Sequence, residues 1–397
     1  MTTTRKTPRS PLAGTPSLLR AINDRAALEL LLANGPLSRT QIGSLTGLSK
    51  PTASQLLARL EAVGLVVPVG TTAGGPGPNA QLYQVNPAAG HVAGVDVTST
   101  AVRVAVADIT GTTLAEHRVS TKGWPAAETV ARVAETVAET VRRAELAPGC
   151  LREVVIGIGG APDPVTGKLR YASHLPGWHS PRLVEELEAA LGAPVSIEND
   201  VNLAAVAEQA GGAAAGCEDF VLLWAEEGIG AAIVIAGRLH RGFTGGAGEV
   251  GYMPVPDAPV SLGSRRKVSG GFQDLAGEPA VLALARRHGL RGTDAAQVVA
   301  GALGTAGGEA FLTELAERLA VGLAVIASVV DPELVVLSGG TPTAGGERLR
   351  ELVQEALGRM SIPRPEVRLS AVPGSPVLTG ALQRALASTR DVLFSTH

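Results

Sequence analysis

The stretch "FVLLWAEEGIGAAIVIAG", residues 220–237, contains the glycine turn from which the fold can be worked out. Two apolar runs, "FVLLWA" and "AAIVIAG", have the length and composition of strands, and Gly228 and Gly230 lie between them. Glycines at such a turn let backbone N–H groups approach an anion closely, as in phosphate-binding loops. Glu226 and Glu227 precede the glycines, and their charges oppose a phosphate. The turn therefore combines the backbone of a phosphate loop with a charge that excludes phosphate.

The bulk composition bounds the class of protein. A chain of 397 residues with 45% hydrophobic residues can form two or three domains, each with its own core. Its two cysteines, Cys150 and Cys217, are too few for a disulfide framework or a thiolate zinc site. No apolar run reaches about 18 residues, and the first residues lack the apolar segment of a signal peptide. We therefore expect a cytoplasmic protein without membrane contact.

Positive charge is concentrated at the N-terminal end. Residues 1–90 contain eight Lys and Arg against three Asp and Glu, whereas the whole chain carries a net charge of −3. A basic segment on an acidic body indicates that this segment meets a polyanion.

Residues 15–88 have the pattern of a winged helix-turn-helix domain, and residues 1–14 before it are predicted to form a disordered arm. After a helix in "SLLRAINDRAALELLLANG", Ser38 can cap a short helix, Gly47 can turn the chain and Ser49 can cap a second helix. The stretch "LVVPVGTTAGGPGPNAQLYQV" then predicts two strands around a glycine-rich tip.

The helix after Ser49 is amphipathic. Its apolar residues recur at helical spacing, and its other face carries hydrogen-bonding and cationic side chains of the kinds that reach phosphates and base edges in a major groove. We predict DNA contacts by Arg39, Lys50, Thr52, Ser54, Gln55 and Arg59. The alternative is a small three-helix packing domain that has no nucleic acid partner.

From about residue 89 the sequence alternates strand and helix patterns, as in α/β folds. We predict two α/β lobes with a cleft between them, over residues 89–200 and 201–397. The last helix, at about 375–390, is expected to return to the first lobe.

Four stretches of this body resemble the ROK family (repressor, open reading frame, kinase). They are "LPGW", "IENDVNLAA", "GRLHRGFTGGAGEVGYMPV" and "VVLSGG", and the similarity extends from about residue 15 to the end. The resemblance implies an actin-like, two-lobed sugar-kinase fold behind a winged helix.

The resemblance also implies a sugar site. In family kinases the aspartate of the motif matched by "END" takes a proton from the sugar, and the preceding asparagine binds the sugar; these positions are Asp200 and Asn199. In the alternative interpretation, Asp200 only caps the following helix. The ligand residues implied by the family are His174, Asn199, Asp200, Glu249, Tyr252 and Asp274.

Several matched positions depart from the family pattern. Tyr252 replaces a histidine that binds the sugar and a structural zinc, and "SLGSRRKVSGGFQDLAG" lacks the cysteines of the zinc cluster, so we expect no metal. His174 stands where relatives often have asparagine, and Asp274 where they have glutamate. These changes predict an altered sugar pocket.

The phosphate loops depart further. Asp96 remains on the first strand, but "TST", residues 98–100, replaces the Gly-Gly-Thr turn of the kinases. Glu226 and Glu227 replace the start of the second loop, whereas the turn at Gly339 and Gly340 is intact. We expect neither ATP nor another cofactor to bind.

These observations lead to three hypotheses. The first is a non-enzymatic transcriptional regulator, most simply a repressor, that binds an operator in double-stranded DNA as a homodimer or tetramer and responds to a sugar or sugar phosphate. The second is an ATP-dependent sugar kinase with an appended DNA-binding domain. The third is a non-catalytic interaction protein that does not bind DNA.

Overall fold

The computed structural model describes residues 16–71, 80–163, 169–170, 177–256 and 271–395. The chain forms two compact units. The head unit comprises residues 1–92, 107–114 and 386–397, and the body unit comprises residues 93–106 and 115–385. The predicted arm, His174 and most of the segment without zinc-binding cysteines lie outside the described residues.

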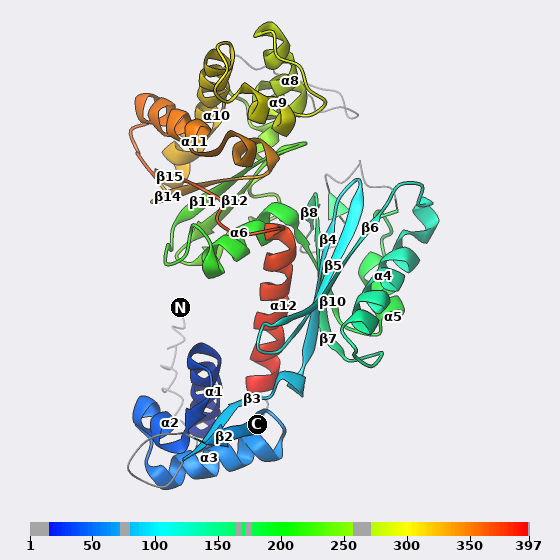
Figure 1. The fold of residues 1–397 in the computed structure, drawn as a ribbon, viewed down its shortest axis with the longest axis vertical. Coiled ribbons are helices and arrows are strands. Elements are labelled where there is room, and N and C mark those ends of the chain that lie inside the picture. The colour runs from blue at the N-terminus through cyan, green and yellow to red at the C-terminus, as the bar shows by residue number, and fades with distance from the viewer. Residues whose placement is uncertain (1–15, 72–79, 164–168, 171–176, 257–270, 396–397) are drawn as a thin grey trace, which may run out of the picture. The chain divides into compact units, whose positions relative to one another are not determined.

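The head unit contains the predicted winged helix-turn-helix (Figure 1). Its elements are α1 (Pro16–Asn34), β1 (Leu37–Ser38), α2 (Arg39–Thr46), α3 (Lys50–Ala62), β2 (Val66–Thr71) and β3 (Gln81–Val85). The three strands form an antiparallel sheet in the order β1-β3-β2. The prediction of two helices and two strands after α1 is therefore confirmed.

The core of the head unit also includes residues from distant parts of the chain. Ile109 and Phe394 are buried in the same apolar cluster as Leu28, Leu56 and Tyr83. The guanidinium of Arg390 donates two hydrogen bonds, of 2.9 and 2.8 Å, to the carbonyl oxygen of Ile109. Arg25 of α1 forms an ion pair with Asp391 at 2.7 Å. The head is thus assembled from three chain segments.

The first sheet of the body has the order β10-β7-β4-β5-β6. Its strands are β4 (His91–Val97), β5 (Ala101–Asp108), β6 (Thr113–Ser120), β7 (Leu151–Ile158) and β10 (Val195–Asn199). Helices α4 (Thr129–Arg143) and α5 (Leu183–Leu191) cover one face of it (Figure 1). Their apolar residues, such as Val133 and Leu187, are buried against sheet residues such as Val104 and Ile156. The short strands β8 (Ala161–Pro162) and β9 (Leu169–Arg170) pair separately.

The second sheet of the body has the order β13-β12-β11-β14-β15. Its strands are β11 (Phe220–Ala225), β12 (Ile229–Ile235), β13 (Arg238–Leu239), β14 (Leu334–Ser338) and β15 (Glu366–Leu369). The helices of this lobe are α6 (Asp200–Gly211), α7 (Phe272–Ala276), α8 (Glu278–Arg287), α9 (Ala295–Ala302), α10 (Gly308–Val330) and α11 (Gly340–Met360). The predicted pair of strands around Gly228 is confirmed as β11 and β12, which pair antiparallel.

The last helix is α12 (Pro376–Ser395), and its first half packs closely within the body unit. Gly380 lies so near α6 that a Cβ there would be 1.8 Å from the carbonyl oxygen of Leu203, and Gly94 on β4 approaches the backbone of Leu378 in the same way. Residues up to Ala385 belong to the body unit, and residues from Leu386 onward belong to the head unit. One continuous helix therefore contributes to both units.

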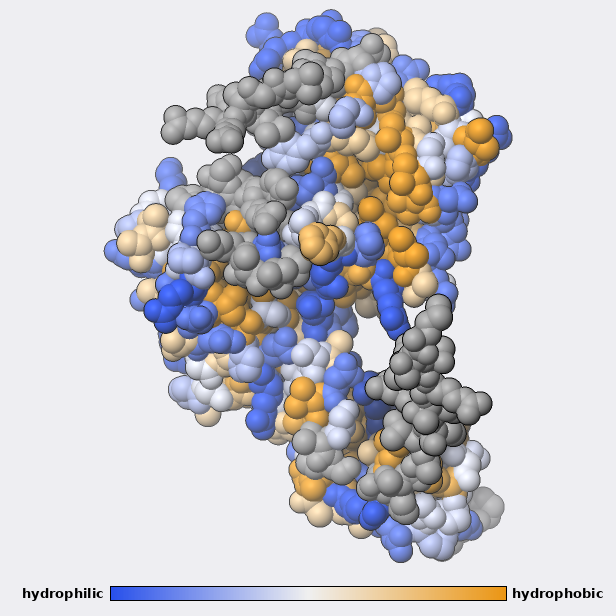
Figure 2. Space-filling view, turned by 180° about the vertical axis from the view of Figure 1, so that it is seen from behind, coloured by the Kyte–Doolittle hydropathy of each residue, from blue (hydrophilic) through white to orange (hydrophobic). Residues whose placement is uncertain are grey.

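Hydrophobic surface gathers on one face of the second lobe (Figure 2). On α10, Val321 and Val325 are partly buried and Val329 is 82% exposed, and their spacing of four residues places them along one stripe of the helix. Among the described residues, no helix is long and apolar enough to cross a membrane.

Candidate functional site

Local signals set the geometry of the helix-turn-helix in the head unit. Ser38 and Gln41 form a capping box at the start of α2, and Gly47 ends that helix in the left-handed region with φ 72°. Ser49 caps α3 by accepting a hydrogen bond from the N–H of Thr52. The apolar face of α3 is buried, which turns its polar face outward.

The structure separates the predicted DNA-contact residues into two groups. Lys50, Thr52 and Gln55 are exposed on α3, and Ser54 is partly buried. Arg59, although exposed, forms an ion pair with the buried Asp24 of α1 at 2.6 Å. Arg39 donates a hydrogen bond to the hydroxyl of Tyr83 and lies 5.4 Å from the centre of its ring. Lys50 and Gln55 therefore have the freest side chains for contact with DNA.

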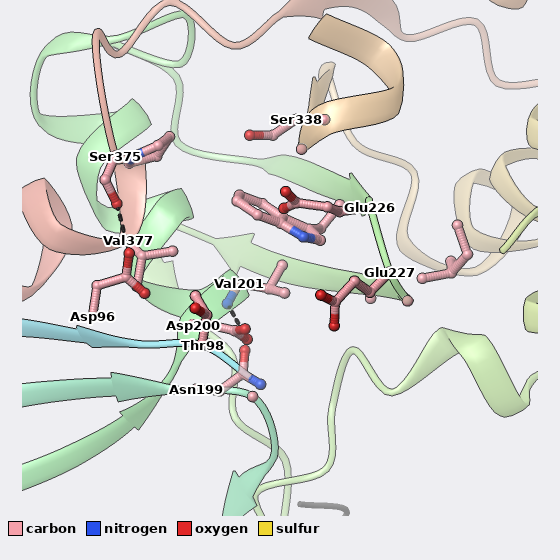
Figure 3. A pocket seen from close by; sticks show the side chains of 18 of the residues that line it. Asp96, Thr98, Asn199, Asp200, Val201, Glu226, Glu227, Ser338, Ser375 and Val377 are labelled. Atoms are coloured by element: carbon pink, nitrogen blue, oxygen red, sulfur yellow. Dashed lines mark hydrogen bonds between the residues drawn. The ribbon is translucent and has the colours of Figure 1, made fainter. Parts of the chain in front are cut away.

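A pocket of about 840 Å³ lies in the body unit where several strands end. Its walls include the turn after β4, the end of β10, the loop between β11 and β12, the start of α11 and the start of α12 (Figure 3). Ligands of α/β proteins bind at such carboxyl ends of strands. Among the predicted ligand residues, Asn199, Asp200, Glu249 and Tyr252 line this pocket together. Asp274 is on α7 and is not one of the described lining residues.

Asn199 and Asp200 occupy the junction between β10 and α6. The side-chain oxygen of Asn199 caps α6 by accepting from the N–H of Asn202 at 3.0 Å, and its amide donates to the carbonyl oxygen of Gly160. Asp200 is the first residue of the helix and accepts from the N–H of Val201 at 2.8 Å. The capping role thus belongs to Asn199, and Asp200 lines the pocket beside it.

Burial raises the pKa values of two carboxyl groups in this pocket. Burial raises the pKa of Asp200 to about 6, and the nearby charge of Asp96 acts in the same direction. Burial raises the pKa of Glu249 to about 7, and the charge of Asp200 adds to it. These carboxyl groups exchange protons near neutral pH, where a carboxylate accepts hydrogen bonds and a carboxylic acid can donate one.

The loop that carries Glu249 is fixed to the second sheet. Gly248 has φ +98°, and a Cβ there would lie 2.0 Å from the carbonyl oxygen of Ala231. The N–H of Ala231 donates to the carbonyl oxygen of Gly248 at 2.8 Å. Only glycine permits this approach, so Gly248 determines where Glu249 meets the pocket.

The turn after β4 and the loop between β11 and β12 contact each other. Ser99, in the turn after β4, donates to the carboxylate of Glu227 at 3.1 Å. The side chain of Glu226 lies over the start of α11, with Oε1 3.5 Å from the point where a Cβ on Gly340 would stand. Partial burial raises the pKa of Glu226, and the charge of Glu227 raises it further. A carboxylate thus lies at a helix N-terminus, where anions are favoured.

Asp96 connects this pocket to α12. It is buried, and its Oδ2 accepts hydrogen bonds from Ser375 at 3.0 Å and from Arg103 at 3.2 Å. Ser375 in turn accepts from the N–H of Leu378 in the first turn of α12. Burial raises the pKa of Asp96, while the hydrogen bonds and the charge of Arg103 oppose that rise.

The sequence predictions did not include a buried ion pair behind the pocket. Glu198, at 4% exposure, accepts from Arg241 at 2.7 and 2.8 Å and from the amide of Asn202 at 3.0 Å. The guanidinium of Arg384 on α12 is 3.9 Å from the same carboxylate. This pair connects β10, which ends at Asn199, to the loop that leads to Glu249. Both residues stand in quoted motifs, but 43 residues separate them, so no local pattern links them.

The fold and the site define a class of protein: a winged helix-turn-helix joined to a two-lobed, sugar-kinase-like body with a pocket at its strand ends. The ROK family model matches residues 92–382, and the chain belongs to this family. A MarR family model matches residues 23–74, within the head.

Relatives of known name include both regulators and kinases. The chain is 27% identical over 365 residues to a xylose repressor of Caldicellulosiruptor bescii, covering 88% of this chain and 90% of that protein. It is 28% identical over 276 residues to a glucokinase of Streptomyces coelicolor, covering 64% of this chain and 84% of that one.

Solved structures confirm the fold. A ROK family transcriptional regulator, described as a homolog of the Escherichia coli MLC protein, superposes with a TM-score of 0.75 at 18% identity, covering 95% of this chain and 99% of that one. A ROK hexokinase from Thermus thermophilus gives a TM-score of 0.63 at 28% identity, covering 76% and 99%. The predicted fold class is therefore confirmed.

Proposed function

We propose that this chain is a sugar-responsive transcriptional repressor, in which the head binds an operator and the pocket binds a sugar or sugar derivative. The observation that carries the proposal is the presence of both parts in one chain: α3 exposes Lys50 and Gln55, and the body holds a carboxylate-lined pocket. Relatives named xylose repressors match most of this architecture, so xylose is the first sugar to test.

The pocket supports sugar binding by its chemistry. Asn199, Asp200 and Glu249 present amide and carboxylate groups that suit the hydroxyls of a sugar. The ligand would act by favouring one arrangement of the protein over another, because a ligand shifts a conformational equilibrium only through its different affinity for the two states.

The proposal assigns no catalytic activity to the pocket. A nucleotide phosphate would meet Glu226 and Glu227 where the kinases have no such charges, and a carboxylate about 4 Å from a phosphate charge costs about 4 kcal/mol at an effective dielectric constant near 20. The hydrogen bond from Ser99 to Glu227 occupies groups of both former phosphate turns.

A second candidate function, that of an ATP-dependent sugar kinase, is supported by one observation. Asp200 stands at the base position of family kinases, and a pKa of about 6 suits a general base near neutral pH. Calorimetric titration with ATP and Mg²⁺ tests it. Micromolar affinity, together with sugar phosphorylation that is lost in Asp200→Ala, would establish the kinase and refute the purely regulatory function.

We propose that the protein acts as a homodimer or larger symmetric oligomer, since paired recognition helices match paired operator half-sites. Val329, the exposed end of the apolar stripe on α10, supports such an interface. Analytical ultracentrifugation of Val329→Asp and of the unchanged chain tests whether the interface includes this residue. We expect the variant to sediment as a smaller species.

The DNA-binding assignment is tested by a double variant, Lys50→Ala with Gln55→Ala, against a duplex selected by the protein from a random library. Lys122→Ala is the matched control, because Lys122 is an exposed cation of the body unit. We expect the double variant to lose at least tenfold in affinity and to show a lower salt dependence, while sugar binding is retained. Operator affinity equal to that of the control would reject α3 as the recognition helix.

A further inference from the structure

The pocket has two ends, and the proposed sugar residues account for only one of them. Asn199, Asp200 and Glu249 belong to the end at β10 and the loop before α7. The other end lies where β11 and β14 finish, and Glu226 and Ser338 line it (Figure 3). Trp224, the register partner of Ser338, also belongs to the lining. A cavity of about 840 Å³ is in the upper part of the range of small-molecule pockets, so it has room for a ligand larger than one sugar ring.

At this second end of the pocket, the hydroxyl of Ser338 is the group that indicates a ligand. The residue is 1% exposed and lines the pocket, yet among the described residues its hydroxyl has no hydrogen-bond partner. Buried hydroxyls are nearly always satisfied, because an unmade hydrogen bond carries the cost of removing the group from water. A ligand hydroxyl beside it would supply the missing partner.

The neighbours of Ser338 suit the ring of a sugar. Trp224 stands directly opposite Ser338 in the parallel pair β11 and β14, and its partly buried indole lines the pocket. An indole provides an apolar face for the C–H groups of a sugar ring. Glu226 is exposed to the pocket and accepts hydrogen bonds. An apolar face, a carboxylate and an unsatisfied hydroxyl together match a surface that carries hydroxyl groups.

The charge of the pocket opposes the binding of a phosphorylated ligand. Its described lining contains five carboxylic acids, Asp96, Asp200, Glu226, Glu227 and Glu249, whereas Arg103 is the one Lys or Arg in that lining. The guanidinium of Arg103 is already paired with Asp96 at 3.2 Å. No cation is left in this lining to neutralise a phosphate.

We propose that the end of the pocket formed by Trp224, Glu226 and Ser338 is a second sugar subsite, and that the effector is an unphosphorylated saccharide of at least two rings. The first ring binds at Asn199, Asp200 and Glu249, and the second ring binds over Trp224 with hydrogen bonds to Ser338 and Glu226. This inference rests on the proposed sugar-binding function and specifies its ligand class.

The test is calorimetric titration of the full chain with matched pairs of sugars: xylose and xylobiose, glucose and cellobiose, and glucose and maltose. Glucose 6-phosphate is added as the charged probe. We expect a disaccharide of one pair to bind at least tenfold more tightly than its monosaccharide. In Ser338→Ala the ratio of the two affinities should fall about three- to tenfold.

Two further variants serve as a control for Ser338→Ala and as a test of the first subsite. Ser361→Ala removes another buried hydroxyl without a partner, outside the described pocket lining, and should leave the ratio unchanged. Asn199→Ala should weaken both members of a pair. Equal affinity for mono- and disaccharide, with no effect of Ser338→Ala on the ratio, would overturn the second subsite and leave the sugar-responsive function intact. Tighter binding of glucose 6-phosphate than of glucose would overturn the exclusion of phosphate. If none of these sugars bound or released operator DNA, the proposed function would fail as well.

Discussion

Replacing Glu249 by glutamine is expected to stabilise the body unit above pH 7 and to leave its stability unchanged near pH 4.5. Burial raises the pKa of this carboxyl from 4.5 to about 7 in the folded protein, so the folded state binds the proton more tightly than the unfolded state. Between these pH values the folded protein keeps a proton that the unfolded chain has lost. Stability from this group is therefore complete below pH 4.5 and is lost as the pH rises through 7.

The size of the effect follows from the same values. A tenfold change in proton affinity corresponds to about 1.4 kcal/mol, so the difference between 4.5 and about 7 sets an upper bound of about 3 kcal/mol. Solvent in the open pocket screens part of the cost, and we expect about 2 kcal/mol at pH 8. Glutamine has nearly the same shape and does not ionise, so the variant should escape this loss.

Urea unfolding followed by tryptophan fluorescence at pH 5, 6, 7 and 8 measures the free energy of unfolding of the variant and of the unchanged chain. All three tryptophans, Trp124, Trp178 and Trp224, belong to the body unit, so the signal reports on that unit alone. Glu355→Gln on the exposed side of α11 is the matched control. A gain for Glu249→Gln that is the same at pH 5 and pH 8, or no larger than that of the control, would refute the assignment of a buried, proton-holding carboxyl.

Three other substitutions test packing and pairing. Gly380→Ala should destabilise the body unit by about 3 kcal/mol in the same urea assay, because the new Cβ meets the backbone of α6. Gly358→Ala is the control: it has open space around it and should stabilise α11 by about 0.5–1 kcal/mol. Equal effects of the two substitutions would contradict the packing of α12 on α6. Arg241→Met should cost about 3 kcal/mol, because buried Glu198 loses its hydrogen-bonded cation and keeps only Arg384, at 3.9 Å. Adding Glu198→Gln should restore part of that stability, and a double variant no better than Arg241→Met would reject the pairing. Phe394→Ala should cost the head unit about 3 kcal/mol, seen as faster hydrogen exchange in residues 16–71; unchanged exchange would show that this side chain does not support the head.

The sequence predicts the local features of this protein well because their causes are local. Ser38, Gly47 and Ser49 mark the ends of α2 and α3 through side-chain caps and a left-handed glycine, all within a few residues of the groups they satisfy. The strands around Gly228 follow from apolar runs of the right length.

The features that escaped prediction depend on distant partners. Glu198 and Arg241 meet across 43 residues, and Arg25 and Asp391 across 366. The lack of a hydrogen-bond partner for the Ser338 hydroxyl depends on the residues around it in space, so no local sequence pattern predicts it. Asn199 and Asp200 are both good capping residues by type, and only the backbone geometry decides that Asn199 is the cap.

The three-segment construction of the head has a consequence for how the protein is made. Residues 1–92 leave the ribosome first, but residues 386–397, which supply Phe394 and Arg390 to the same unit, follow roughly 300 residues later. At about 5–20 residues per second, that interval is about 15–60 s. A nascent chain thus carries a head unit without its complete apolar core throughout synthesis of the body.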